Sequence, residues 1–223
     1  MAEYETALSR GWTPVYRFAR ALLGGLARLL FRPTVIGAEH IPATGPVLIA
    51  PIHRSNVDFV FTIFLSRRKV YFMAKEGIFK TRWFSLVLRD LGAFKVERGS
   101  TDREAMRLSE RALGEGLALI VFPEGTRGEG YHVQPLHDGA MFVAARTGAM
   151  VVPVGIAGSD EAMPVGAWLP RPSKVVVVVG EPIHPPVPGP EGRVKRSEVA
   201  AASEELRQRL EDVYHQALER RGA

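Results

Sequence analysis

The stretch GPVLIAPIHRSNVDF, residues 45–59, joins a short apolar run to a polar turn and then to a new apolar segment. The apolar run predicts a buried strand over Val47–Ala50. A helix over Asn56–Leu65 is expected to follow, because Ser55 or Asn56 can cap its first turn. The stretch therefore predicts a strand, a turn and a helix, with polar residues placed where the strand ends.

Strands and helices alternate along the rest of the chain. Apolar runs predict further strands over Lys69–Met73, Ala93–Val96, Leu117–Phe122, Met150–Ile156 and Lys174–Val179. Further helices are expected over Ile78–Leu88, Asp102–Leu113, Ala140–Thr147 and about Ser197–Arg220. This alternation predicts an α/β fold, a single domain whose largely parallel or mixed sheet is flanked by helices.

An amphipathic helix is predicted ahead of this domain, over Pro14–Phe31. Its apolar stripe consists of Val15, Phe18, Ala19, Leu22, Leu26, Leu29 and Leu30. Arg17, Arg20 and Arg28 lie largely off the stripe and leave no run of about 20 apolar residues, so we reject a transmembrane span. The helix either lies flat in a membrane interface or packs onto the core. We divide the chain into an N-terminal membrane-associating helical segment, residues 1–33, and an α/β domain, residues 34–223.

The amino-acid composition excludes several kinds of functional site. The chain has no cysteine, which excludes disulfides, thiolate metal sites and a cysteine nucleophile. His132 and His137 flank a loop, but no third ligand accompanies them in the sequence. We therefore predict no metal site and no cofactor.

Positive charge is concentrated in one region. The chain has a net charge of +5, and the segment from Ser66 to Arg111 alone carries 12 lysines and arginines against 6 acidic residues. Bulky aliphatic and aromatic side chains are interleaved with these charges. This mixture favours an anionic membrane surface over nucleic acid as the partner.

His53 and Asp58 are the first candidate site residues. In open α/β sheets, ligands bind beyond the carboxyl ends of the strands. Asp58, in the first turn of the next helix, can fold back and accept a hydrogen bond from one imidazole nitrogen of His53. The other nitrogen is then free to take a proton, as in a base and its orienting carboxylate. The alternative is a capping aspartate beside a loop histidine.

Two further motifs follow apolar strands. VFPEGTR, residues 121–127, places Glu124 and Arg127 at a strand end, and GAFKVERG, residues 92–99, places Lys95 and Arg98 at another. An arginine in such a place can hold a phosphate or carboxylate with two hydrogen bonds. The alternative for the first motif is a turn with a surface ion pair.

The motifs HRSNVD, GAFKVERG, FPEGTR and VVPVGI occur in this order. Together they resemble the four blocks of the glycerolipid acyltransferases, of the 1-acylglycerol-3-phosphate acyltransferase type, over about Pro46–Glu161. The resemblance implies transfer of a fatty acyl group from acyl-CoA or acyl carrier protein to a lysophospholipid hydroxyl. It also implies an enzyme of phospholipid biosynthesis on the cytoplasmic face of the cell membrane, attached peripherally or monotopically.

The resemblance also implies roles for single residues. His53 matches the catalytic base and Asp58 its aspartate. Substrate-binding roles fall on phosphate-contacting and acceptor-site residues, namely Lys75, Arg98, Glu124, Gly125, Thr126 and Arg127. Two departures from the family pattern, Ile52 before the histidine and Asp138 where lysine is common, bear on the acceptor. We expect 1-acylglycerol-3-phosphate, which would give phosphatidate, with glycerol-3-phosphate or another lysophospholipid as the alternative.

A mechanism follows from the groups that are present. The chain has neither a G-x-S-x-G motif nor a cysteine, so we expect direct transfer without an acyl-enzyme. Backbone N–H groups near Gly125, or at the start of the helix after His53, are expected to stabilise the oxyanion. A non-catalytic membrane lipid-binding protein on the same fold is the competing interpretation, and a nucleic-acid binder is a more distant one.

Overall fold

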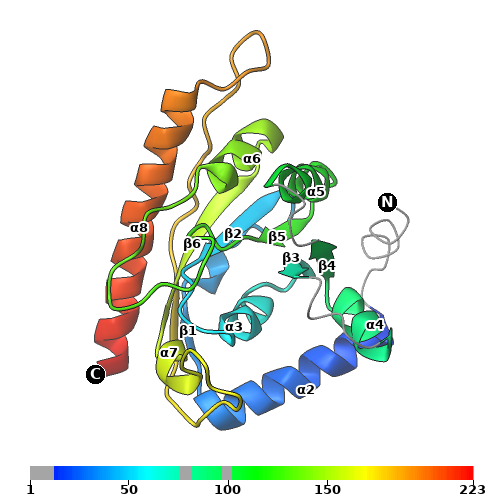
Figure 1. Cartoon of the computed structure of the whole chain (residues 1–223), viewed down its shortest axis with the longest axis vertical. Helices are drawn as coiled ribbons and strands as arrows, with labels where there is room; N and C mark the ends of the chain where they lie inside the picture. Colours follow the sequence, from blue (N-terminus) through cyan, green and yellow to red (C-terminus); the bar gives the residue numbers. More distant parts are fainter. Residues whose placement is uncertain (1–12, 76–81, 97–101, 223) are drawn as a thin grey trace.

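Seven strands form the mixed sheet at the centre of the molecule, in the order β1-β7-β6-β2-β5-β3-β4 (Figure 1). The computed structural model describes residues 13–75, 82–96 and 102–222. The strands are β1 (Thr34–Ile36), β2 (Val47–Pro51), β3 (Val70–Lys75), β4 (Ala93–Val96), β5 (Ala118–Ile120), β6 (Met150–Ala157) and β7 (Val176–Val179). Neighbouring strands run parallel, except that β6 and β7 are antiparallel.

Helices cover both faces of the sheet (Figure 1). They are α2 (Pro14–Phe31), α3 (Asp58–Leu65), α4 (Arg82–Asp90), α5 (Asp102–Gly114), α6 (Gly139–Thr147), α7 (Ser159–Ala162) and α8 (Arg196–Gly222), with a short 3-10 helix η1 (Ala38–His40). α8 packs on β6 and β7, and α6 contacts both α5 and α8. α2 contacts α3 and α4 instead.

The connections that leave β2 and β5, which are neighbours in the sheet, run toward opposite edges of the sheet. After β2 it passes through α3 to β3 and then to β4, whereas after β5 it passes through α6 to β6 on the other side of β2. Since crossover connections are right-handed, these opposite directions send α3 and α6 to opposite faces of the sheet. Ligands of α/β proteins bind where neighbouring loops diverge in this way.

A close contact between α8 and the sheet involves a glycine. Gly155 lies in β6, and a Cβ atom added there would lie 2.4 Å from the carbonyl oxygen of Val213 in α8. The absence of a side chain therefore allows the backbone of α8 to touch the backbone of the sheet. Leu206, Leu210 and Tyr214 of α8 are buried at the same interface.

The N-terminal helix α2 begins and ends at defined caps. The Thr13 side chain accepts a hydrogen bond from the Tyr16 N–H, and Arg32 ends the helix in the left-handed conformation at φ 41°. Tyr16 and Phe31 are buried against the rest of the protein.

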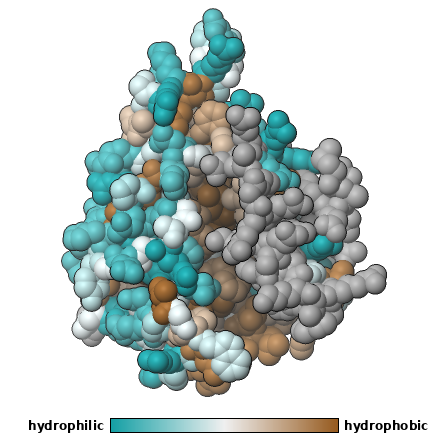
Figure 2. Space-filling view, viewed as in Figure 1, coloured by the Kyte–Doolittle hydropathy of each residue, from teal (hydrophilic) through white to brown (hydrophobic). Residues whose placement is uncertain are grey.

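The apolar stripe of α2 faces outward. Phe18 is 69% exposed and Leu29 is 76% exposed, and Val15, Leu22 and Leu26 are also exposed. Figure 2 shows hydrophobic surface at the lower edge of the molecule, where α2 lies in Figure 1. The interpretation of this stripe as a core-packing face is therefore wrong for these five side chains.

Arg20 lies off the stripe, as the sequence suggested, and is turned toward α3. Its guanidinium donates hydrogen bonds to the carbonyl oxygens of Ile63 and Ser66, both at 2.7 Å. Carbonyl groups at the end of a helix have no partner within the helix, and Arg20 supplies one for the end of α3. Arg17 and Arg28 remain exposed on α2.

The α/β fold class predicted from the sequence is confirmed, and the described element boundaries that differ from the prediction shift by one or two residues. The sequence analysis missed β1 and α7. Ser159, expected in a strand-to-loop turn, begins α7 and is buried. The predicted helix over Ile78–Leu88 begins in residues outside the described part, and its described portion is α4.

None of the described helices is long and apolar enough to span a membrane.

Candidate active site

His53 and Asp58 form a hydrogen-bonded pair at the carboxyl end of β2. The Nδ1 atom of His53 lies 3.0 Å from Oδ2 of Asp58, whose carboxylate is fully buried. The same oxygen accepts the backbone N–H groups of Arg54 and Ser55, both at 2.7 Å. Because a carboxylate oxygen only accepts, Nδ1 carries the ring proton and Nε2 is the nitrogen that can take another. The His53 ring stacks on Phe122, with ring centroids 4.2 Å apart.

The turn between His53 and α3 differs from the sequence expectation in one detail. Helix α3 begins at Asp58, and the residue before it, Val57, makes no side-chain cap. Ser55, expected as a cap, instead donates its hydroxyl to the carbonyl oxygen of Met163 at 2.7 Å. The predicted fold-back of Asp58 toward His53 is nevertheless present, since its carboxylate bonds to the turn as well as to the imidazole.

Glu124 supports His53 from the opposite side. Its Oε2 accepts the backbone N–H of His53 at 2.8 Å, and its Oε1 accepts the N–H of Gln134 at 2.9 Å. Both oxygens also contact Nη1 of Arg54, at 2.8 and 3.0 Å. The Glu124 side chain is fully buried and that of Arg54 is 2% exposed. With both oxygens engaged internally, the geometry favours a positioning role over the acceptor-binding role inferred from the sequence.

Arg54 is the site residue that the sequence analysis missed. Besides Glu124, its guanidinium donates to the carbonyl oxygens of His53 and His132, at 3.0 and 2.8 Å. It also lies 5.2 Å from the ring centroid of Tyr214, whose pKa is raised chiefly by burial. Its place between His53 and Asp58 in the sequence was a usable signal, because a cation in a turn that is buried at the end of a strand requires a charge partner.

Two glycines shape the loop that follows β5. Gly125 has φ +69°, and a Cβ there would lie 2.8 Å from the His137 ring. Gly128 donates its N–H to the carbonyl oxygen of His53 at 2.8 Å, and a Cβ there would lie 2.5 Å from Arg54 Nη1. The motif after β5 therefore folds back onto the His53 loop because these two positions lack side chains.

Those of the remaining predicted residues that the structure describes lie along the same edge. Thr126 is exposed and Arg127 is partly exposed, on the turn after β5. Lys75 is the last residue of β3, the strand parallel and adjacent to β5, but its side chain lies outside the described part. Arg98 also lies outside the described residues. The structure thus brings together the motifs of residues 53–58 and 124–127.

Four of the backbone N–H groups in the regions proposed to stabilise the oxyanion are already occupied. The Gly125 N–H donates to the carbonyl oxygen of Phe122 at 3.1 Å, and the Asp58 N–H donates to Ser55 at 3.2 Å. The N–H groups of Arg54 and Ser55 bind Asp58. The geometry therefore does not support these particular groups as an oxyanion hole.

An apolar cavity of about 460 Å³ opens beside the pair. Phe122, which stacks on His53, forms part of its wall together with Met73, Met106, Val121, Ala140 and Val143. Figure 2 shows hydrophobic surface within the hollow at the middle of its view. A larger cavity of about 510 Å³ lies along α2, lined by Arg17, Arg28 and Phe64 among others, away from the His53 pair. We assign the chemistry to the smaller cavity because its wall residue Phe122 stacks on His53.

The chain is similar in sequence and in fold to known acyltransferases. The family model described as Acyltransferase matches residues 32–157, which include both motifs of the site. The solved structure of the 1-acyl-sn-glycerophosphate (LPA) acyltransferase PlsC from Thermotoga maritima matches with a TM-score of 0.72 and 26% identity. That match covers 88% of this chain and 78% of the other.

Curated relatives carry the same kind of name. The chain is 27% identical over 204 residues to the 1-acyl-sn-glycerol-3-phosphate acyltransferase of Bacillus subtilis, covering 89% of this chain and 96% of that protein. It is also 27% identical over 158 residues to the chloroplastic acyltransferase LPAT1 of Arabidopsis thaliana. That second match covers 69% of this chain and 44% of the relative.

Proposed function

The chain belongs to the acyltransferase family, and from this we propose that it acylates the free hydroxyl of 1-acylglycerol-3-phosphate to give phosphatidate. The donor is a fatty acyl thioester, acyl-CoA or acyl carrier protein. The observation that carries the proposal is the pairing of His53 with Asp58 beside an apolar cavity. The names of the relatives support the choice of acceptor.

The groups at the site suffice for a direct transfer. Nε2 of His53 takes the proton of the acceptor hydroxyl as its oxygen attacks the thioester carbonyl. The new C–O bond forms and the C–S bond breaks, and the departing sulfur takes the proton from Nε2. Asp58 keeps Nδ1 protonated and stabilises the imidazolium between these steps, as in other base and carboxylate pairs.

Substrate contacts are assigned by charge and polarity. Arg127 and Arg98 bind the acceptor phosphate in this proposal, with Lys75 as a further phosphate contact. Gly125 and Thr126 line the acceptor side of the turn. The acyl chain of the donor occupies the apolar cavity next to Phe122, because a hydrocarbon chain gains free energy there. Glu124 holds the His53 loop and does not touch substrate.

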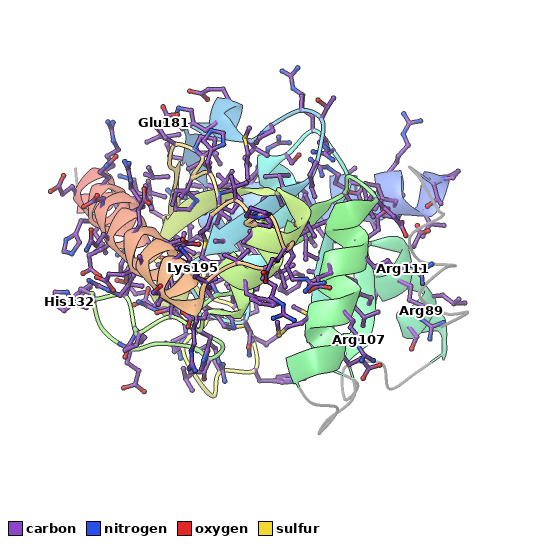
Figure 3. The ribbon with its side chains drawn as sticks, turned by 90° about the horizontal axis from the view of Figure 1, so that it is seen from above. Arg89, Arg107, Arg111, His132, Glu181 and Lys195 are labelled. Atoms are coloured by element: carbon purple, nitrogen blue, oxygen red, sulfur yellow. The ribbon has the colours of Figure 1, made fainter. Side chains whose placement is uncertain are left out.

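The proposal includes a location. Residues 1–33 attach the protein to a membrane surface, and residues 34–223 form the catalytic domain. Arg89, Arg107 and Arg111 add positive charge on the side formed by α4 and α5 (Figure 3). The attachment is peripheral or monotopic and on the cytoplasmic face, where acyl thioesters are made available to the enzyme.

A defined assay tests the proposal. Purified protein is supplied with one acyl-CoA, or one acyl carrier protein thioester, and separately with 1-acylglycerol-3-phosphate, glycerol-3-phosphate and lysophosphatidylcholine. We expect phosphatidate by mass spectrometry, one thiol released per product, and the fastest rate with 1-acylglycerol-3-phosphate. Preferred acylation of another acceptor would refute the assigned substrate, and lipid binding without thiol release would favour the non-catalytic alternative.

A further inference from the structure

Three side chains capable of binding a metal meet outside the acyltransferase site. His132, on the loop between β5 and α6, places Nδ1 2.8 Å from Oε1 of Glu211 in α8. His215, one helical turn further along α8, places Nε2 3.2 Å from the same oxygen. The three candidate ligand atoms all lie within 4.8 Å of one another. Figure 3 shows His132 at the outer edge of the molecule, on the side where α8 lies.

We propose that His132, Glu211 and His215 bind one divalent transition-metal ion, of the zinc or nickel class. Imidazole nitrogens suit these ions, whereas magnesium and calcium prefer ligands that are all oxygen. Two histidines and one glutamate with an open fourth position form a known zinc ligand set. The prediction of no metal rested on the loop histidines lacking a third ligand, and the structure supplies two further ligands from α8.

The distances suit a metal as well as a hydrogen-bonded cluster. Metal–ligand bonds of about 2.0–2.1 Å in a tetrahedron place ligand atoms about 3.3 Å apart. The observed 2.8 and 3.2 Å need only small side-chain rotations to reach that spacing. The His132 side chain is 82% exposed and that of His215 is 49% exposed, so both can rotate and water can reach the fourth position.

Glu211 is oriented by its surroundings. Its Oε2 accepts the backbone N–H of Val133 at 2.8 Å, which turns the other oxygen toward both histidines. Arg207 approaches Oε2, at 3.8 Å, and not the oxygen that the histidines share. A carboxylate ligand fixed by a hydrogen bond on its second oxygen is typical of built metal sites.

The site is connected to the catalytic loop. The carbonyl oxygen of His132 accepts a hydrogen bond from Arg54, and Arg54 binds Glu124, which holds the backbone of His53. A metal that ties His132 to α8 therefore also restrains the loop against which Arg54 is packed. This inference does not depend on the acceptor or donor of the transfer reaction.

Metal titration of the full chain tests the proposal. Protein without a polyhistidine tag is freed of metal with EDTA, exchanged into buffer, and titrated with ZnCl₂ and with NiCl₂ by calorimetry. We expect one ion per chain and, at a hundredfold excess over Kd, a rise in Tm of about 5–10 °C. MgCl₂ should produce neither signal.

Single variants locate the ion. His132→Ala and His215→Ala should each weaken zinc binding at least tenfold, because each removes one of three protein ligands, and should reduce the shift in Tm to about half or less. His184→Ala removes an exposed histidine elsewhere and should change neither. Circular dichroism checks that each variant is folded. The proposal is overturned if the wild type binds no ion, if His132→Ala or His215→Ala binds as well as the wild type, or if His184→Ala weakens binding equally.

Discussion

Two buried carboxylates hold His53 from opposite ends. Asp58 contacts its ring and Glu124 contacts its backbone N–H. His53→Ala should lower kcat by about 10²–10⁴-fold, the range that a general base supplies. Asp58→Asn should lower kcat as well, because the amide no longer stabilises the imidazolium. Both are measured at saturating donor and acceptor, with circular dichroism to show an intact fold.

Asn56→Ala is the matched control for these two variants. Asn56 is exposed on the same turn and should leave kcat unchanged. A His53→Ala protein with a near-normal rate would eliminate the base mechanism. If Asn56→Ala loses activity while His53→Ala and Asp58→Asn keep it, the catalytic group lies elsewhere in the turn.

Variants of the Arg54–Glu124 ion pair distinguish an effect on stability from an effect on activity. Glu124→Gln leaves the buried cation of Arg54 without its charge partner and should destabilise the fold by about 3–5 kcal/mol in urea unfolding. The double variant Arg54→Met with Glu124→Leu removes both charges and should recover much of that loss. Its kcat should stay low, because the His53 N–H has lost its acceptor.

The kinetic pattern of these variants tests the role of Glu124. A positioning residue affects kcat, whereas a residue that binds the acceptor equally in ground and transition states raises KM. We expect the acceptor KM to change little in the double variant. A raised KM with a normal kcat would restore the acceptor-binding interpretation of Glu124.

At the scale of secondary structure, the sequence predicts those strands and helices that depend on the local pattern of apolar residues. β2 and β6 are continuous apolar runs and are buried almost throughout, so their strands were predictable. β1 has only three residues and is stabilised by pairing with β7, about 140 positions later in the chain, which leaves no local signal. Arg20 likewise looks like a surface residue until the end of α3 is placed beside it.

Glycine substitutions test how α8 meets the sheet. Gly155→Ala should destabilise the protein by about 3 kcal/mol or more, because the new Cβ would collide with the backbone of Val213 and Tyr214. Gly25→Ala in α2 meets nothing within 4 Å and should stabilise by up to about 1 kcal/mol through helix propensity. Urea unfolding measures both. If both variants change the free energy of unfolding by a small amount of the same sign, α8 can shift away from β6.

At the scale of the molecule, topology made part of the site predictable. Strands that end at one edge of a parallel sheet bring their loops together, so His53 and Glu124 could be expected near each other from sequence alone. Their exact relation could not, because it depends on Arg54 pairing with a residue 70 positions away. The same limit hid the cluster of His132 with Glu211, which are 79 positions apart.

Besides the outward stripe of α2, exposed apolar side chains occur on a segment that is bonded to the end of this helix. Trp168 is 87% exposed and Leu169 is 63% exposed, in the segment between α7 and β7. Ser173 and Val175, at the end of this segment, donate their N–H groups to the carbonyl oxygens of Leu30 and Phe31. In Figure 1 the segment turns beside the end of α2. The segment that carries these two exposed side chains is thus hydrogen-bonded to the end of α2.

The outward stripe of α2 leads to a prediction about membrane attachment. Leu22→Glu and Leu29→Glu change exposed side chains of the stripe and should leave the fold intact. Each apolar side chain buried in a bilayer contributes about 1.5 kcal/mol or more, so each variant should weaken binding to anionic vesicles about tenfold. Turnover on vesicle-borne 1-acylglycerol-3-phosphate should fall accordingly, whereas turnover on a soluble short-chain acceptor should not. Sedimentation with vesicles and the paired assays measure the two effects.

A control on another surface makes the membrane test specific. Val187→Glu adds the same charge at a side chain that is 82% exposed in the loop before α8, and it should leave vesicle binding unchanged. Arg28→Ala should cost about 1 kcal/mol of binding to anionic vesicles and little to neutral ones, because a cation near the surface acts through the lipid charge. Arg20→Ala should instead lower thermal stability, since its guanidinium caps α3. If Leu29→Glu and Val187→Glu weaken vesicle binding equally, α2 is not the attachment site and the exposed stripe needs another partner.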